Sequence, residues 1–148
     1  MALHDEDITD AIIGAAIEVH RHLGPGSLES AYRRCMVHEL RLREVVVASE
    51  VSIDLEYKGL LVPASYRLDL LVADRVVVEI KAVDRVTPIH EAQLLTYLRL
   101  SGRNSGLLLN FKVKLLRDGI TRRVDGRSAP GNGVPRPRPP ARQWRGAE

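Results

Sequence analysis

The sequence predicts an α/β domain with a mixed central sheet flanked by helices, in the order α-α-β-β-β-α-β. Three observations predict this class. Apolar side chains recur at helical spacing as far as Leu40, and the period then changes to 2 from Val51 onward. A further helical stretch opens on Pro88 and separates the strands before it from one after it. The chain has 148 residues, 45% of them hydrophobic and 28% charged, which fits one globular domain.

Two amphipathic helices are predicted at the N-terminal end. Residues 6–22 place isoleucine and alanine at helical spacing, and this helix is expected to end at residues 24–26, which are Gly-Pro-Gly. Ser27 is expected to cap the second helix, whose apolar stripe runs from Leu28 to Leu40. Each helix therefore has one face to bury against a sheet.

Three strands are predicted to follow. Residues 51–56 alternate apolar and polar side chains, and this strand is expected to end in a turn at residues 57–59. Two more strands are expected at about 60–72 and 76–83. Pro63 is expected to mark an edge or a bulge in the first of these two, because proline cannot donate a hydrogen bond to a neighbouring strand.

The C-terminal part of the domain is predicted to be a helix and two strands. Pro88 suits the first turn of a helix running to about Leu100, and Gly102 follows its end. Residues 105–111 predict a buried strand, and residues 114–123 a short edge strand.

The composition excludes several classes of protein. No apolar run approaches the roughly 20 residues that span a bilayer, and the acidic N-terminus lacks the pattern of a signal peptide. A single cysteine, Cys35, excludes an internal disulfide. We therefore expect a cytoplasmic protein without a membrane segment.

The predicted domain covers residues 1–124, and residues 125–148 are predicted to be a disordered tail rich in proline, arginine and glycine. The tail holds five of the 22 basic and two of the 19 acidic residues, so 17 of each remain in the domain and cancel. The net charge of +3 belongs to the tail, and it does not by itself predict a basic surface for nucleic acid.

Charged residues interrupt the two most hydrophobic strands. Asp69 lies in the first, and Glu79 and Lys81 lie two residues apart in the second, so the latter two share a face. A two-residue turn between the strands would place Asp69 opposite Ile80, on the other face. A three-residue loop at 73–75 would place Asp69 opposite Glu79 and would also pair the aliphatic residues, so we expect that register.

This pair of carboxylates predicts either a metal site or a salt-bridge cluster. Two carboxylates at cross-strand distance raise each other's pKa unless a cation lies between them. Lys81 offsets part of the repulsion, and a divalent metal offsets more, because Mg²⁺ and Mn²⁺ prefer oxygen ligands. Surface salt-bridge clusters are common for such patterns, whereas the aliphatic flanks indicate buried positions where an unpaired charge is costly. The residues alone leave both interpretations open.

The motifs carry a resemblance to a known family. Asp69 followed by Glu79-Ile80-Lys81 resembles the D…(D/E)-x-K signature of the PD-(D/E)XK nuclease superfamily, whose restriction-endonuclease-like core is α-β-β-β-α-β. Residues 26–32, GSLESAY, are similar to the G-x-x-E-x-x-Y motif of a bacterial family within it. The segments EYKG, EIKAV, HEAQLLTYL and GLLLNF also resemble that family. The resemblance covers roughly residues 5–124, and Leu68 stands where the superfamily name has proline.

The resemblance implies a metal-dependent nuclease. Asp69 and Glu79 would hold one or two Mg²⁺ (or Mn²⁺) ions, with the Ile80 backbone carbonyl as a further ligand. Lys81 would orient the attacking water or stabilise developing charge. The reaction would be hydrolysis of a phosphodiester bond by in-line attack.

Further residues are candidates for supporting roles. The resemblance implies that Glu29 is an additional acidic ligand or a water-positioning group, and the alternative is an ion pair with Arg33. It also implies that Gln93 supports the site or contacts DNA, with Tyr97 on the same helix face, and the alternative is an ordinary solvent-facing polar stripe.

Two further candidates are more readily structural. Tyr32 is expected to be a packing residue whose hydroxyl is hydrogen-bonded rather than a catalytic acid. His90 shares the helix face of Gln93 and Tyr97 and could support the site, but no second His or Cys stands at ligand spacing from it.

We therefore expect a Mg²⁺-dependent nuclease that acts on DNA in preference to RNA. One alternative is a non-catalytic module on the same fold that binds nucleic acid or a protein. Another is a purely structural interaction protein, which would require the charged trio to face solvent. The absence of an attached recognition domain favours a protein partner for substrate recruitment.

Overall fold

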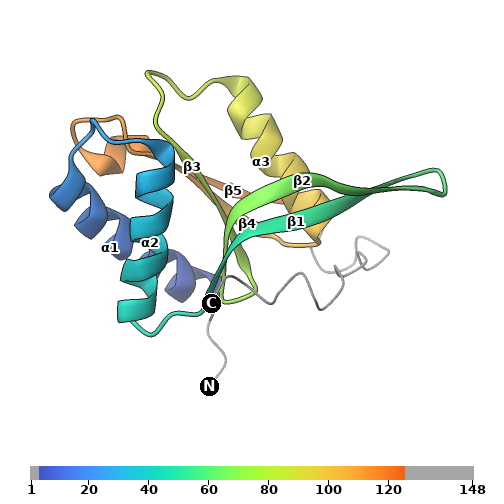
Figure 1. Ribbon diagram of the computed structural model, residues 1–148, viewed down its shortest axis with the longest axis horizontal. Coiled ribbons are helices and arrows are strands. Elements are labelled where there is room, and N and C mark those ends of the chain that lie inside the picture. The colour runs from blue at the N-terminus through green and yellow to red at the C-terminus, as the bar shows by residue number, and fades with distance from the viewer. Residues whose placement is uncertain (1–3, 126–148) are drawn as a thin grey trace.

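A computed structural model of the chain describes residues 4–125, and its elements follow the predicted order (Figure 1). The elements are α1 (Asp5–Leu23), α2 (Glu29–Leu42), β1 (Val47–Tyr57), β2 (Leu60–Val72), β3 (Val76–Lys81), α3 (Pro88–Ser101), β4 (Ser105–Asn110), a short 3₁₀ helix η1 (Leu116–Gly119) and β5 (Ile120–Val124). The predicted tail lies outside the described residues, apart from Asp125. Among the described residues, no helix is both long and apolar enough to cross a bilayer.

The five strands form one mixed sheet in the order β1-β2-β3-β4-β5. The β3–β4 pair is parallel, with α3 as the connection between them, and the other three pairs are antiparallel. Because β3 and β4 are interior strands with both faces covered, their sequences are nearly continuous aliphatic runs. The predicted α/β class, a mixed sheet flanked by helices, is confirmed.

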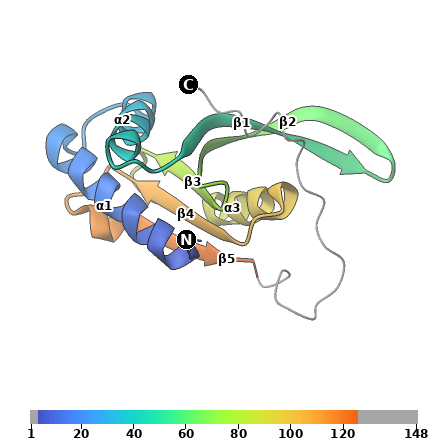
Figure 2. The same ribbon diagram turned by 90° about the horizontal axis from the view of Figure 1, so that it is seen from below.

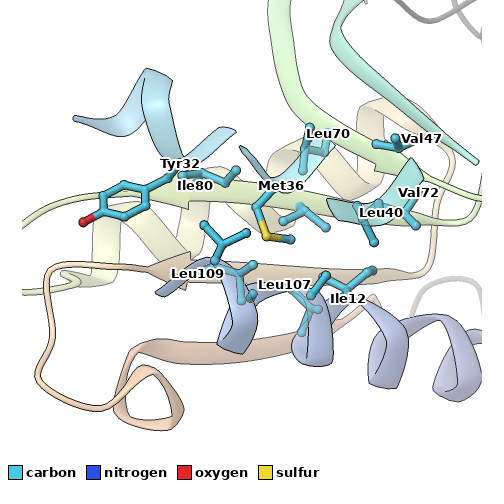
Figure 3. Packing of buried hydrophobic residues seen from close by; sticks show 14 of the residues in the cluster. Ile12, Tyr32, Met36, Leu40, Val47, Leu70, Val72, Ile80, Leu107 and Leu109 are labelled. Carbon is cyan, nitrogen blue, oxygen red and sulfur yellow. The ribbon is translucent and has the colours of Figure 1, made fainter. Parts of the chain in front are cut away.

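The sheet divides the core into two hydrophobic clusters. Helices α1 and α2 cover one face of the sheet, and α3 covers the other (Figure 2). Figure 3 shows the first cluster, in which side chains of α2 lie over those of β2 and β3; the labelled residues from these elements are Tyr32, Met36, Leu40, Leu70, Val72 and Ile80. Successive residues of β3 alternate between the clusters, as the period of a strand requires.

The start of α2 differs from the prediction, whereas both ends of α3 match it. The N-cap of α2 is Leu28, and no side chain caps it, so the expected cap by Ser27 is wrong. The backbone N–H of Ser27 instead donates to the Tyr32 hydroxyl, at 3.0 Å. Helix α3 begins at Pro88 and is followed by Gly102 in the left-handed conformation, with φ of 70°, as a C-terminal glycine permits.

The long β1–β2 hairpin extends beyond the rest of the domain (Figure 1) and contains the bulge expected near Pro63. Ile53 pairs with Tyr66, but Leu55 pairs with Val62, so β2 has extra residues at this point. Ala64 lies there with a φ of +50°, and its N–H donates to the Asp54 carboxylate at 2.9 Å. The irregularity increases the local twist of the hairpin.

The register between β2 and β3 is the predicted one. Leu70 pairs with Val78 and Val72 pairs with Val76, so the connecting loop has three residues. Two of them, Ala73 and Asp74, adopt left-handed backbone conformations, with φ of 53° and 56°. Because Leu70 pairs with Val78, the residue before Leu70 stands across from the residue after Val78. The three-residue loop therefore brings Asp69 to the same face as Glu79.

Gly119 is expected to be intolerant of a side chain. A Cβ atom there would lie 2.1 Å from the backbone carbonyl oxygen of Asn110, whereas a Cβ at Gly26 would meet nothing within 4 Å. Gly119→Ala should therefore lower the free energy of unfolding by about 1–3 kcal/mol or more, and Gly26→Ala should change it by less than about 0.5 kcal/mol. Urea denaturation checks this, and equal stability of the two variants would contradict the close approach of η1 to β4.

Candidate active site

Two hydrogen bonds link Asp69 to β3 at the point where the β2–β3 ladder ends, one to Glu79 and one to Ile80. The last paired residues are Leu70 and Val78. Beyond them, the Asp69 N–H donates to Glu79 Oε1 at 3.2 Å, and the Ile80 N–H donates to Asp69 Oδ2 at 2.8 Å. Each carboxylate thus takes the place of a missing backbone acceptor on the opposite strand. The two side chains are held together by backbone groups of both strands.

The hairpin changes face at Asp69, which explains why pairing stops there. Residues two apart in a regular strand share a face, yet Leu68 packs with the α3-side cluster and Leu70 with the cluster under α1 and α2. On β1, Glu50 occupies the position across from Asp69, and its φ is +53°. β1 and β2 are therefore irregular at facing positions, and the β2–β3 ladder does not include Asp69.

Burial and the neighbouring charge act strongly on Glu79. The residue is only 6% exposed. Burial, and then the negative charge of Asp69, raise the pKa of the Glu79 carboxyl from 4.5 to about 9, although the hydrogen bond from the Asp69 N–H and the charge of Lys81 act in the opposite direction. Without a cation, Glu79 is protonated at neutral pH, and a divalent ion beside the pair would favour the ionised form.

Lys81 lies at the end of β3, half-buried and on the same face as Glu79. The chain after it is fixed by Asn110 of β4, for which the sequence indicated no definite role. The Asn110 Oδ1 accepts from the Val83 N–H at 3.0 Å, and its Nδ2 donates to the Val83 carbonyl at 2.9 Å. These bonds hold the backbone beyond Lys81 against β4, so Lys81 is carried on a fixed segment.

The oxygen atoms at this position fit a hard divalent cation. Two carboxylates are adjacent, and a third oxygen is available from the backbone. In an extended strand the N–H and the C=O of one residue point to the same side, and the Ile80 N–H points to Asp69. The Ile80 carbonyl therefore points to the side of β3 on which Asp69 lies, and its role as a ligand of Mg²⁺ or Mn²⁺ stays a prediction.

The number of protein ligands is small. Within residues 4–125, no three His, Cys, Asp or Glu side chains gather closely enough to hold a metal ion. An ion bound by Asp69, Glu79 and the Ile80 carbonyl would take its remaining ligands from water or from the phosphate of a substrate, which is how proteins commonly bind Mg²⁺.

The α3 side of the site contains two tyrosines. Burial raises the pKa of the Tyr97 hydroxyl, and the charges of Glu79 and Asp69 raise it further, so Tyr97 lies close enough to the carboxylates to interact with them. The ring of Tyr66 meets the Tyr97 ring edge-on, with 5.8 Å between centroids. Tyr66 was missed by the sequence analysis, although it lies only three residues before Asp69 on β2.

Gln93 and His90 take different positions on α3. Gln93 is exposed and precedes Tyr97 by one turn, so the two can share a helix face. His90 uses its ring to begin the helix, because its Nδ1 accepts from the Thr87 N–H at 3.0 Å. That bond occupies one of the two ring nitrogens of His90 in a structural role.

Tyr32 is a packing residue with its hydroxyl hydrogen-bonded, as predicted. Its ring is buried and stacks on Phe111, with 4.4 Å between centroids and 13° between planes. Its hydroxyl donates to the Gly24 carbonyl and accepts from the Ser27 N–H. Tyr32 thus fixes the turn that leads into α2, which accounts for the tyrosine at the end of the GSLESAY segment.

Glu29 is not brought together with the carboxylate pair. It lies in the first turn of α2 and is exposed. The alternative ion pair with Arg33 is wrong, because Arg33 instead binds Glu50, at 3.3 Å. Figure 3 shows that Tyr32, one turn further along α2, lies beside Ile80 of β3. Glu29 therefore occupies the end of α2 nearest the site, without contacting it.

Comparison with known protein families decides the classification. The family model described as the PD-(D/E)XK nuclease superfamily matches residues 6–123. The chain belongs to the PD-(D/E)XK nuclease superfamily. No curated protein and no solved structure matches it. The mixed five-stranded sheet agrees with the restriction-endonuclease-like fold of this superfamily. Its nucleases generally use divalent metals, so membership suggests a metal-dependent nuclease acting on nucleic acid.

The raised pKa of Glu79 predicts how the stability of the metal-free PD-(D/E)XK domain depends on pH. Between about pH 4.5 and about pH 9, the folded state keeps a proton that the unfolded state loses. The free energy of unfolding should therefore fall as pH rises through this window, by at most about 1.4 kcal/mol per pH unit. Glu79→Gln should abolish this fall and be more stable than wild type at about pH 8 in EDTA.

Urea denaturation in EDTA at several pH values provides the measurement. The exposed Glu56 of the hairpin supplies the control, since Glu56→Gln should follow the wild-type curve. A Glu79→Gln curve parallel to wild type would show that burial does not act on this carboxyl.

Proposed function

We propose that this PD-(D/E)XK protein is a Mg²⁺-dependent nuclease that hydrolyses phosphodiester bonds, in DNA in preference to RNA, with Mn²⁺ able to replace Mg²⁺. The observation that carries the proposal is the Asp69–Glu79 pair, joined through backbone N–H groups where the ladder ends. The charge of Lys81 acts on Glu79, and burial makes an unneutralised second charge in the pair costly. The GSLESAY segment supports placement in the GxxExxY branch, and the single cysteine supports a cytoplasmic location.

Each residue of the carboxylate pair and its neighbours on β3 has a separate role in the proposed hydrolysis. Asp69, Glu79 and the Ile80 carbonyl would hold the cation, which would lower the pKa of a water molecule and neutralise charge on the scissile phosphate. The Lys81 ammonium orients the attacking water and stabilises the charge that develops on the phosphate oxygens. The hydrogen bond from the Ile80 N–H keeps the Asp69 carboxylate in place while substrate binds.

Three further residues have proposed roles in the same reaction. Glu29 acts as an additional acidic ligand or water-positioning group once substrate and metal are bound, which its position in the GSLESAY segment supports. Gln93 contacts substrate from the exposed face of α3, and Tyr97 supports the carboxylates from the same helix.

A second candidate function is a non-catalytic module on the same fold that binds nucleic acid or a protein partner. The observation that favours it is the small number of acidic ligands among the described residues, where Glu29 does not join the pair. The two candidates differ in whether purified protein cleaves nucleic acid without a partner.

Lys81→Ala is expected to reduce cleavage by about 100-fold or more, because it removes a charge placed at the developing negative charge of the transition state. The assay uses purified protein with single- and double-stranded DNA and RNA, in Mg²⁺, Mn²⁺ or EDTA. Lys114→Ala is the matched control, since Lys114 is exposed and lies outside the proposed site. Cleavage that survives Lys81→Ala, or that continues in EDTA, would rule out the mechanism.

Asp69→Asn is expected to abolish stabilisation by metal, independently of any nuclease activity. A cation that binds only the folded state raises the melting temperature as its concentration increases. Wild type should therefore melt at a higher temperature in Mg²⁺ or Mn²⁺ than in EDTA, whereas Asp69→Asn should not. Asp54→Asn in the hairpin, away from the carboxylate pair, is the control. An equal shift in Asp69→Asn and wild type would place the metal elsewhere.

A further inference from the structure

Tyr66 of β2 and Tyr97 of α3 form an aromatic pair on the side of the sheet that α3 covers. Their rings meet edge to face, with 5.8 Å between centroids and 62° between planes. Both residues pack against the hydrophobic cluster that includes Leu68 and Val77. Both are half-buried, so part of each side chain is exposed to solvent. An edge-on contact also leaves the two faces of the ring that supplies the edge uncovered by its partner.

The other aromatic contact of the domain is of a different kind. Tyr32 and Phe111 stack with 4.4 Å between centroids, and both are fully buried, as expected of rings that fill the core. The chain has few aromatic residues, namely four tyrosines, one phenylalanine and one tryptophan. Core packing alone therefore does not account for two partly exposed tyrosines that meet beside the candidate site.

Both tyrosines lie close to the carboxylate pair. Tyr66 precedes Asp69 by three residues, which correspond to about 10 Å of strand. Burial, and then the charges of Glu79 and Asp69, raise the pKa of the Tyr97 hydroxyl, so this side chain is within electrostatic reach of both carboxylates. Glu79 lies two residues after Val77 of the cluster under α3 and points to the same face of the sheet. The aromatic pair and the Glu79 carboxyl therefore share one face.

The part of β2 that carries Tyr66 is paired along one edge only. In the described part of the chain, β2 pairs with β3 only at residues 70–72, whereas its pairing with β1 extends back to Leu60. Across residues 4–125, no strand therefore covers the β3-side edge of β2 before Asp69. The two rings lie next to an edge of the sheet that is open beside the candidate site.

Partly exposed aromatic rings next to a phosphodiester site are suited to unpaired bases. Proteins that bind single strands stack bases on aromatic side chains, and this stacking tolerates any base because every base has a π-face. In an intact duplex, both faces of an internal base are already stacked on its neighbours. Such a base cannot stack on a tyrosine unless it is first extruded from the duplex.

We propose that Tyr66 and Tyr97 form a stacking platform for an unpaired base of the substrate, next to the phosphate that is cleaved. This inference rests on the proposed nuclease function and assigns its substrate class, single-stranded nucleic acid or the unpaired end of a duplex. One ring stacks on the base, and the other holds that ring in place through the edge contact. The distance from Tyr66 to Asp69 along β2 places the base within about three nucleotides of the phosphate at the carboxylates.

The test measures binding without cleavage. Fluorescein-labelled oligonucleotides of about 20 nucleotides are titrated in EDTA, and affinity is followed by anisotropy. The probes are a thymidine single strand, an abasic strand that has the same phosphates without bases, and a DNA duplex. Wild type should bind the thymidine strand about tenfold more tightly than the abasic strand, because only the former can stack. This comparison needs no variant.

Tyr66→Leu keeps an apolar side chain at the same position but removes the ring. It should bind the thymidine strand about tenfold more weakly than wild type and bind the abasic strand and the duplex as wild type does. Because no phosphate contact is lost, its plot of log affinity against log salt should keep the wild-type slope. Tyr66→Phe, which keeps the ring, should retain wild-type affinity.

The matched control is Tyr57→Ala, which removes a tyrosine that is 59% exposed on the hairpin and should bind every probe as wild type does. Melting temperatures establish that each variant is folded. A uridine single strand of RNA shows which nucleic acid the platform takes, and a loss in Tyr66→Leu on either single strand supports the inference.

Equal wild-type affinity for the thymidine and abasic strands would overturn the inference, as would unchanged affinity of Tyr66→Leu for both single strands. A loss that extends to the duplex or to Tyr66→Phe would also overturn it, because it would indicate a structural effect. These results leave the nuclease proposal intact, since that depends on cleavage and Lys81. Ring-dependent binding by a wild type that cleaves nothing would support the platform and refute the nuclease.

Discussion

The candidate site depends on two hydrogen bonds that replace the β2–β3 ladder where it ends. The Asp69 carboxylate accepts from the Ile80 backbone, and the Glu79 carboxylate accepts from the Asp69 backbone. A strand backbone that lost its partner without this substitution would leave buried donors unsatisfied. The same two bonds place two acids side by side, at the cost of electrostatic repulsion between them. Structural integrity and chemistry therefore rest on the same pair of side chains.

The repulsion within this pair explains why the residues around it are arranged as they are. Burial and the neighbouring acid hold a proton on Glu79. A cation beside the pair would reduce the electrostatic repulsion between the two carboxylates. Lys81 relieves part of the repulsion, and Asn110 keeps the segment beyond Lys81 against β4. Natural proteins concentrate such local conflicts where they function, and here the conflict lies at the residues of the superfamily signature.

The β1–β2 hairpin departs from regular strand geometry at one pair of facing positions, and the two acids there have different partners. Glu50 and Asp69 lie across from each other where both strands leave regular geometry. One acid faces two arginines, from α2 and β2, and the other is bound to β3. A bulge or a change of face is a common way to direct side chains at the edge of an active site. In this domain the Glu50 ion pairs and the Asp69–Glu79 pair lie on neighbouring strands at this irregular position.

The sequence by itself determined the order of elements, the three-residue loop before β3 and hence the adjacency of Asp69 and Glu79. These features follow from local periodicity and turn length, which a single chain segment contains. Only the tertiary structure decided that Arg33 binds Glu50 rather than Glu29, and that Tyr66 packs against a tyrosine of α3. Such contacts join residues from different elements, and their partners are chosen by how helices pack on the twisted sheet, which local patterns do not encode.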